Sequence, residues 1–232
     1  MKLFQRLIRD RRAIAMTEFA LAAPVFLTAG LWGLETANLA ITHMRISQAA
    51  MQIADNASRI GDTSMFEYRK IYESDINDIF VGANIQAGNS IDLFEHGRVI
   101  LSSLEGDSSG DQSIHWQRCM GAKEAVSSFG LAGDTGITGM GPPGEEVMAM
   151  PDDAVMFVEV VYDYQPLVTD ALVSDTTIRT HAAFTVRSSR DLTQIYQRDS
   201  AKPDPISDCN TYNGYKASVP ENKVGHWSWN WG

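Results

Sequence analysis

The most constraining feature of this sequence is a long apolar run close to its N-terminus, from Ile14 to Leu34. The run is 21 residues long, reads IAMTEFALAAPVFLTAGLWGL and contains one ionisable side chain, that of Glu18. Because an α-helix rises about 1.5 Å per residue, this run would span roughly 31 Å, the thickness of the hydrocarbon core of a bilayer. A core helix of a soluble protein is the alternative, but such helices rarely run this long without a polar face. The sequence therefore predicts one transmembrane helix.

Charge is distributed unevenly on the two sides of this run. Residues 1–13 hold five basic side chains and one acidic one, a local charge of +4, whereas the whole chain carries −10. Positive charge before a membrane helix is typical of the end that stays in the cytoplasm. The rest of the chain is strongly acidic, which argues against nucleic-acid binding, because neutralising phosphates requires a Lys/Arg-rich surface. We therefore expect a cytoplasmic N-terminus, an extracytoplasmic body and no nucleic-acid partner.

An ordinary cleaved signal peptide fits this N-terminus less well. Its apolar region should be free of charge and should end in a small-x-small cleavage site. Here Glu18 lies near the start of the run. The candidate sites at the far end are spoiled by Glu35 and Asn38, which occupy positions where a small residue is needed. We therefore expect the helix to remain part of the chain.

An acidic residue inside a membrane segment costs about 2.5–3.5 kcal/mol on insertion scales, so it normally marks function. The string around Glu18, RRAIAMTEFAL over residues 11–21, resembles the processing region of class III prepilins and of TadE/TadG-like minor pilins (pseudopilins) of the Tad, or Flp, pilus system. In that family a basic leader ends in a small residue, usually Gly, and the fifth mature residue is Glu, followed by an aromatic residue. The resemblance implies that Ala13 ends the leader, that Ile14 becomes the mature N-terminus, and that Glu18 and Phe19 are the Glu-aromatic pair. Ala13 departs from the usual Gly.

The resemblance implies a function in the assembly of a Tad-type pilus for adhesion. It also implies that the partners are other pilin subunits, pilus-assembly membrane proteins, a prepilin peptidase and the lipid bilayer. The location would be the inner membrane, crossed once, with the domain in the periplasm or at the cell surface in the pilus. The alternative is an uncleaved, membrane-anchored binding subunit of an envelope complex, which the departure at Ala13 favours.

Beyond the membrane run, apolar residues recur every three to four positions up to about Gly61, so the helix should continue into the soluble domain. A capping-box pattern at residues 64–67 predicts the start of a second helix. The apolar residues of that helix are Tyr68, Ile71, Tyr72, Ile79 and Phe80.

From residue 97 the apolar period changes to two, which predicts strands. The predicted strands are Gly97–Leu104, Ser113–Cys119, Val155–Tyr164 and Ile178–Arg187, with a Gly-rich loop at residues 130–146. Two helices followed by strands with short connections predict an α+β fold, with an antiparallel sheet of about four strands packed on the long helix. The chain thus divides into a basic leader at 1–13, a long transmembrane and pilin-like helix at 14–61, and an extracytoplasmic α+β domain at 62–232. Its Trp-rich end, HWSWNWG, suits an added edge strand or a partner contact.

Two later blocks extend the resemblance. Residues 116–121 look like the W-x-x-C-x-G segment of TadE-like proteins, and residues 143–164 look like their strand that ends in an aromatic-acidic-aromatic run. Each block is weak alone and persuasive only in this order.

The two cysteines, Cys119 and Cys209, lie far apart and have no histidine partners at zinc-site spacing. They are either two unrelated buried thiols or one disulfide. An extracytoplasmic, oxidising location favours the disulfide. No P-loop, GxSxG, HExxH or CxxC motif occurs in the sequence, so we expect neither an enzyme nor a cofactor or metal site.

Overall fold

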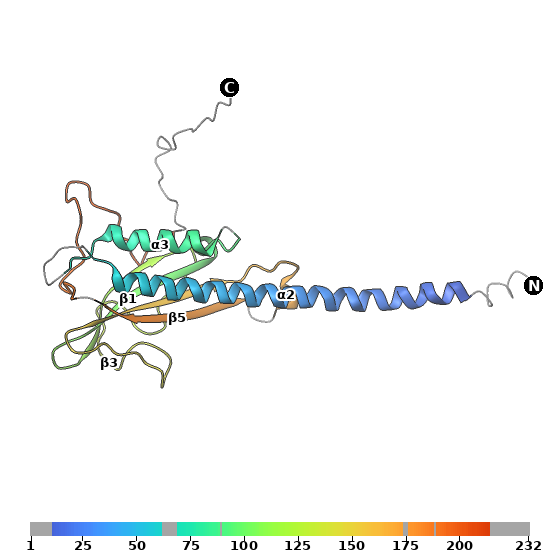
Figure 1. Ribbon diagram of the computed structural model, residues 1–232, viewed down its shortest axis with the longest axis horizontal. Helices are drawn as coiled ribbons and strands as arrows, with labels where there is room; N and C mark the ends of the chain where they lie inside the picture. Colours follow the sequence, from blue (N-terminus) through green and yellow to red (C-terminus); the bar gives the residue numbers. More distant parts are fainter. Residues whose placement is uncertain (1–10, 62–68, 89, 174–175, 188, 214–232) are drawn as a thin grey trace, which may run out of the picture. The chain divides into compact units, whose positions relative to one another are not determined.

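The computed structural model describes residues 11–61, 69–88, 90–173, 176–187 and 189–213. The chain forms two compact units: one comprises Met1–Met44 and Tyr164–Thr176, and the other Arg45–Asp163 and Thr177–Gly232. The helices of the described residues are α2 (Arg11–Arg59), α3 (Glu73–Ala87), α4 (Leu93–His96) and the 3-10 turn η1 (Asp170–Leu172). The strands are β1 (Gly97–Gly106), β2 (Gln112–Met120), β3 (Thr135–Ile137), β4 (Ala154–Asp163) and β5 (Thr177–Thr185) (Figure 1).

Helix α2 confirms the long helix predicted from the sequence, and it belongs to both units. It is 49 residues long and ends at Arg59, two residues before Gly61, which adopts a φ of 138°. In the first unit its apolar side chains are exposed, whereas in the second unit the predicted apolar stripe is buried. The buried residues of that stripe are Ile46, Ala49, Ile53 and Ala57, and the neighbouring Ala50 and Ala54 are buried as well. One helix therefore carries an uncovered apolar half and a half that packs into a folded core.

The second unit is built on a five-stranded antiparallel sheet with the order β3-β2-β1-β4-β5. The two central strands, β1 and β4, are buried along nearly their whole length. The four strands predicted from the alternating pattern are all present. The fifth strand, β3, lies in residues 130–146, which were predicted to be a Gly-rich loop. It has only three residues, which is too short for a period-two pattern to reveal.

Each face of this sheet has its own cover. The face that carries Val160 and Tyr162 lies against the two long helices: Ser47 of α2 contacts Thr180 of β5, and Tyr162 donates to the carbonyl of Ile91, after α3. The opposite face packs against the connection between β2 and β4. Its core residues are Leu104, Ile114, Met140, Ala149, Val155 and Phe157. The α+β architecture expected from the sequence is therefore correct.

The predicted start of the second helix is wrong. Ile71 and Tyr72 precede α3 in an extended segment, and the helix begins at Glu73. The reason is a long-range pairing: Glu73 N–H donates to the Tyr196 carbonyl and Tyr196 N–H to the Ile71 carbonyl, which holds this segment extended. The capping box at residues 64–67 and Tyr68 lie outside the described residues, as does the Trp-rich end.

Candidate functional site

The four residues of the expected processing and assembly region lie on the first turns of α2. Ala13, Ile14, Glu18 and Phe19 are all helical. Glu18 follows Ile14 by four residues, which is about one turn and a rise of roughly 6 Å. The side chains of Glu18 and Phe19 are exposed, that of Phe19 to 70 %. The helix thus presents Glu18 on an apolar surface, and the described residues of this unit leave that surface uncovered.

The apolar half of α2 is exposed along its length. Its large exposed residues are Met16, Phe19, Leu21, Val25, Phe26, Leu27, Leu31, Trp32 and Leu34. Two hydroxyls bond within the helix: Thr28 Oγ1 donates to the Pro24 carbonyl at 2.7 Å, and Thr36 Oγ1, just beyond the run, donates to the Trp32 carbonyl at 2.9 Å. A continuous apolar surface of this size requires a cover. The helix is long and apolar enough to cross a membrane.

A second acidic residue on α2, Glu35, occupies a very different environment. It lies one residue beyond the apolar run and is fully buried. Its carboxylate accepts hydrogen bonds from Tyr164 Oη at 2.5 Å and from the backbone N–H groups of Leu167 at 3.1 Å and Val168 at 2.7 Å. Asn38 Nδ2 in turn donates to Tyr164 Oη at 2.7 Å. The connection between β4 and β5 is therefore fixed to α2 through one carboxylate.

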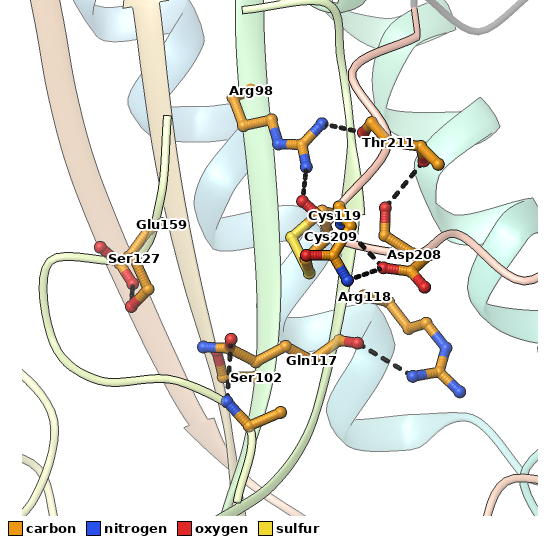
Figure 2. Close-up of a disulfide and its surroundings, with 12 residues drawn as sticks. Arg98, Ser102, Gln117, Arg118, Cys119, Ser127, Glu159, Asp208, Cys209 and Thr211 are labelled. Atoms are coloured by element: carbon orange, nitrogen blue, oxygen red, sulfur yellow. Dashed lines mark hydrogen bonds between the residues drawn. A yellow bond between two sulfur atoms is a disulfide. The ribbon is translucent and has the colours of Figure 1, made fainter. Parts of the chain in front are cut away.

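The predicted disulfide between Cys119 and Cys209 is confirmed. The two sulfurs are 2.07 Å apart, and the bond joins β2 to the C-terminal segment across 90 residues of sequence (Figure 2). The Cys119 N–H also donates to the Ser207 carbonyl at 2.9 Å, and Asn77 of α3 donates to the Pro205 carbonyl at 2.8 Å. The segment from Pro205 to Thr211 is thereby bound along the edge of β2.

Arg98 of β1 completes the attachment of this C-terminal segment. Its side chain is fully buried and donates to the carbonyls of Cys209 and Thr211 at 2.6 Å each (Figure 2). It also donates to the carbonyl of Gly121 at 2.8 Å. The guanidinium lies over the ring of Tyr212, 4.3 Å from its centroid. Burial lowers the pKa of Arg98, and the charges of Tyr212 and Asp208 partly offset this effect.

The W-x-x-C-x-G block, residues 116–121, contacts several segments that are distant in sequence. Gln117 donates to Ser102 Oγ and to the Gly130 carbonyl and accepts from the Ala132 N–H, while Arg118 forms an ion pair with Glu73 of α3. Gly121 has a φ of 124°, and a Cβ at this position would lie 2.1 Å from the Gly97 carbonyl oxygen. Gln117 and Arg118 bind different neighbouring segments, so both polar residues of the block have a structural explanation.

The polar groups of the loop-covered face are also bonded to one another. The Ser127 hydroxyl and the Ser128 N–H donate to the carboxylate of Glu159, whose pKa is raised by burial and lowered in part by these hydrogen bonds. His181 lies opposite Glu159 in the sheet and stacks on Phe157. Ser127 thus bonds a carboxylate directly, which is not the serine–histidine contact of an activated nucleophile. Among the described residues, no three His, Cys, Asp or Glu side chains are placed to hold a metal ion.

Comparison of the chain with models of protein families, with curated proteins and with solved structures finds no match. The Tad-pilus resemblance therefore rests on the residues of the chain itself.

Two features of these sites were missed from the sequence. In the sequence, Glu35 bore only on the signal-peptide alternative, and its hydrogen-bond partners come from residues about 130 positions later. Arg98 gave a weak signal as a cation directly before the apolar residues 99–101 of a strand. A charged residue in such a strand is rarely buried unless it is paired, and this could have prompted a search for its acceptors.

Proposed function

We propose that this chain is a minor pilin, or pseudopilin, that takes part in assembling a Tad-type pilus for adhesion. The observation that carries the proposal is the position of Glu18. It is an acidic side chain on the exposed apolar half of a continuous helix, five residues after a basic, small-residue sequence that resembles a prepilin processing site. Exposure of a carboxylate on a surface otherwise suited to lipid is unfavourable unless a partner covers it.

Cleavage between Ala13 and Ile14 would create that partner. The new α-amino group of Ile14 is a cation at the end of the mature helix, and Glu18 lies one turn along. A helix cannot easily fold its own terminus back onto Glu18, but a neighbouring subunit with a one-turn stagger can bring its amine there. The ion pair would form away from water, where unpaired charges are costly. Pairing would therefore select processed subunits and set their register.

This function places the chain in the inner membrane, with its basic end in the cytoplasm and residues 36–232 in the periplasm or in the pilus. The charge asymmetry supports this orientation. The Cys119–Cys209 disulfide supports an oxidising compartment for the body of the chain. The partners would be other pilins, the membrane proteins of pilus assembly and a prepilin peptidase.

The test is Glu18→Ala in a strain that makes the complete pilus system. We expect membrane insertion and the disulfide to be retained, because Glu18 is exposed and lies far in sequence from the folded core. We expect co-purification with other pilins and the number of pili to fall to background. Thr28→Ala is the matched control, since it removes another exposed polar group from the same apolar surface, and its hydroxyl bonds only within the helix. Normal pili in the Glu18→Ala strain would rule out the mechanism.

The second candidate function is an uncleaved, membrane-anchored subunit that binds another envelope protein. Ala13, which stands where the resembling family usually has Gly, favours it. In that case Glu18 would have no α-amine to pair with, and Glu18→Ala would leave complexes intact.

A further inference from the structure

The connection between β4 and β5, residues 164–176, carries exposed apolar side chains at the end of the membrane run. We call residues 164–169 the collar loop. Leu167 is 61 % exposed and Val168 is 38 % exposed. These two residues also supply the backbone N–H groups that bind the carboxylate of Glu35. Their backbone is thus fixed to α2 while their side chains remain uncovered.

The attachment point lies at the expected boundary of the bilayer. Glu35 is the first residue after the 21-residue apolar run. Leu31 and Trp32 precede it by four and three residues, so they lie on the same face of α2, one turn earlier and inside the run. Both are exposed, Trp32 to 59 %. Trp is enriched at the level of the lipid headgroups, so Trp32 marks the interface about 4.5 Å along the helix from Glu35.

We propose that the collar loop lies in the headgroup region of the bilayer that α2 spans, with Leu167 and Val168 in contact with lipid and with Glu35 as the clamp that holds the loop there. This inference rests on the membrane location in the proposed function, but it does not depend on cleavage or on pilus assembly. The surface has one occupant, a lipid bilayer, because Leu167 and Val168 are bound to Glu35, which shares a face of α2 with the exposed apolar residues Leu31 and Trp32.

The hydrogen bonds of Glu35 fit this location. A carboxylate beside the hydrocarbon boundary has few waters to solvate it, so it needs donors from the protein. Two successive backbone N–H groups form such an anion-binding turn, and the Tyr164 hydroxyl adds a third donor. A clamp that served only to close the β4–β5 connection would not explain why the two residues supplying the amides expose apolar side chains. Contact with lipid accounts for both features.

The inference can be tested with nitroxide spin labels on the full chain, reconstituted in phosphatidylcholine vesicles without other pilus proteins. Both native cysteines are in the disulfide, so a single introduced cysteine can be labelled. Leu167→Cys reports the collar loop, Val25→Cys the middle of the apolar run, and Val126→Cys a comparably exposed apolar position in the second unit. Collisions with oxygen measure exposure to lipid, and collisions with a water-soluble nickel chelate measure exposure to water.

We expect the Leu167 label to collide with nickel several-fold less often than the Val126 label, and with oxygen more often. Glu35→Gln, which exchanges one acceptor for a donor, should raise nickel collisions at Leu167 and leave the Val25 label unchanged. A Leu167 label as accessible to nickel as that at Val126, with the Val25 label in lipid, would overturn this inference and leave the proposed function standing.

Three other outcomes would also count against the inference. Shielding of the Leu167 label from both reagents, in a manner that grows with the protein-to-lipid ratio, would show contact with a second copy of the chain. An unchanged signal in Glu35→Gln would remove Glu35 as the clamp. Both the Leu167 and Val25 labels in water would overturn the membrane location itself, and with it the proposed function.

Discussion

Glu18 and Glu35 lie on one helix and differ in what surrounds them. Glu35 accepts three hydrogen bonds from a connection that is distant in sequence, whereas Glu18 is exposed on an apolar surface. Buried carboxylates are stabilised by donors within their own fold, and exposed ones in an apolar setting need donors from elsewhere. At the scale of single residues, Glu35 is therefore a structural group, and Glu18 is the group for which we propose a partner on a neighbouring subunit.

Gly121 gives a sharp prediction at this scale. Gly121→Ala combines a φ of 124° with a Cβ placed 2.1 Å from the Gly97 carbonyl oxygen, so β1 and β2 must move apart where Arg98 binds. We expect the free energy of unfolding to fall by about 3 kcal/mol or more, the range for strained backbone combined with a clash. Urea unfolding of the detergent-solubilised full chain measures this loss.

Gly110→Ala is the control for Gly121→Ala. Gly110 has a similarly positive φ of 87°, but nothing lies within 4 Å of its would-be Cβ. The free energy of unfolding of Gly110→Ala should fall by only about 1 kcal/mol, the cost of the backbone conformation alone. Equal losses in the two variants would show that close packing at Gly121 is not what requires glycine.

At the scale of elements, the period of the apolar residues predicted those helices and strands whose boundaries depend on local sequence. The helical period gave α2 to within a few residues, and the alternating period gave β1, β2, β4 and β5. The start of α3 could not be found this way, because Tyr196 holds Ile71 and Tyr72 extended through contacts more than 120 residues away. Strand β3 was missed because three residues carry no measurable period.

The disulfide was predicted from the expected compartment rather than from geometry. Chain spacing could not distinguish a bond from two separate thiols. The acceptors of Arg98 were equally hidden, since the carbonyls of Cys209 and Thr211 reach it only when the C-terminal segment folds back on the sheet. The C-terminal segment is attached through tertiary contacts, and sequence patterns do not predict which residues make them.

Removal of the disulfide should release the C-terminal segment. In Cys119→Ser/Cys209→Ser we expect faster hydrogen exchange at the Cys119 position, whose N–H donates to the Ser207 carbonyl, because the segment loses its covalent tie. The chain-entropy cost for a closed loop of 90 residues gives an upper bound of about 4–5 kcal/mol on the lost stability. Exchange followed by mass spectrometry on the detergent-solubilised chain measures the release.

Amides in the middle of α3 serve as the internal control and should keep their protection. Protection at position 119 that survives the double substitution would show that the Arg98 hydrogen bonds suffice to hold the segment. Two free thiols found by alkylation of non-reduced protein taken from its own membranes would contradict the oxidised state.

At the scale of the whole molecule, fold class and function differ in how far the sequence determines them. The α+β architecture follows from periodicity, and the structure confirms it. The proposed function depends on a short N-terminal pattern whose chemistry would be completed by a peptidase and by neighbouring subunits. A single folded chain does not contain those partners, so the fold can be derived from one copy and the assembly role only proposed.

The central claim is that a processed N-terminus and Glu18 act together. The most direct measurement is the N-terminal sequence of the protein purified from its own membranes, in cells that express the complete pilus system. We expect a single N-terminus at Ile14, because a basic leader and the small residue Ala13 precede an apolar helix. A mutant that lacks the prepilin peptidase should yield the uncut chain. Intact Met1 in cells with an active peptidase would contradict the pairing of a processed N-terminus with Glu18 and favour the membrane-anchored binding subunit.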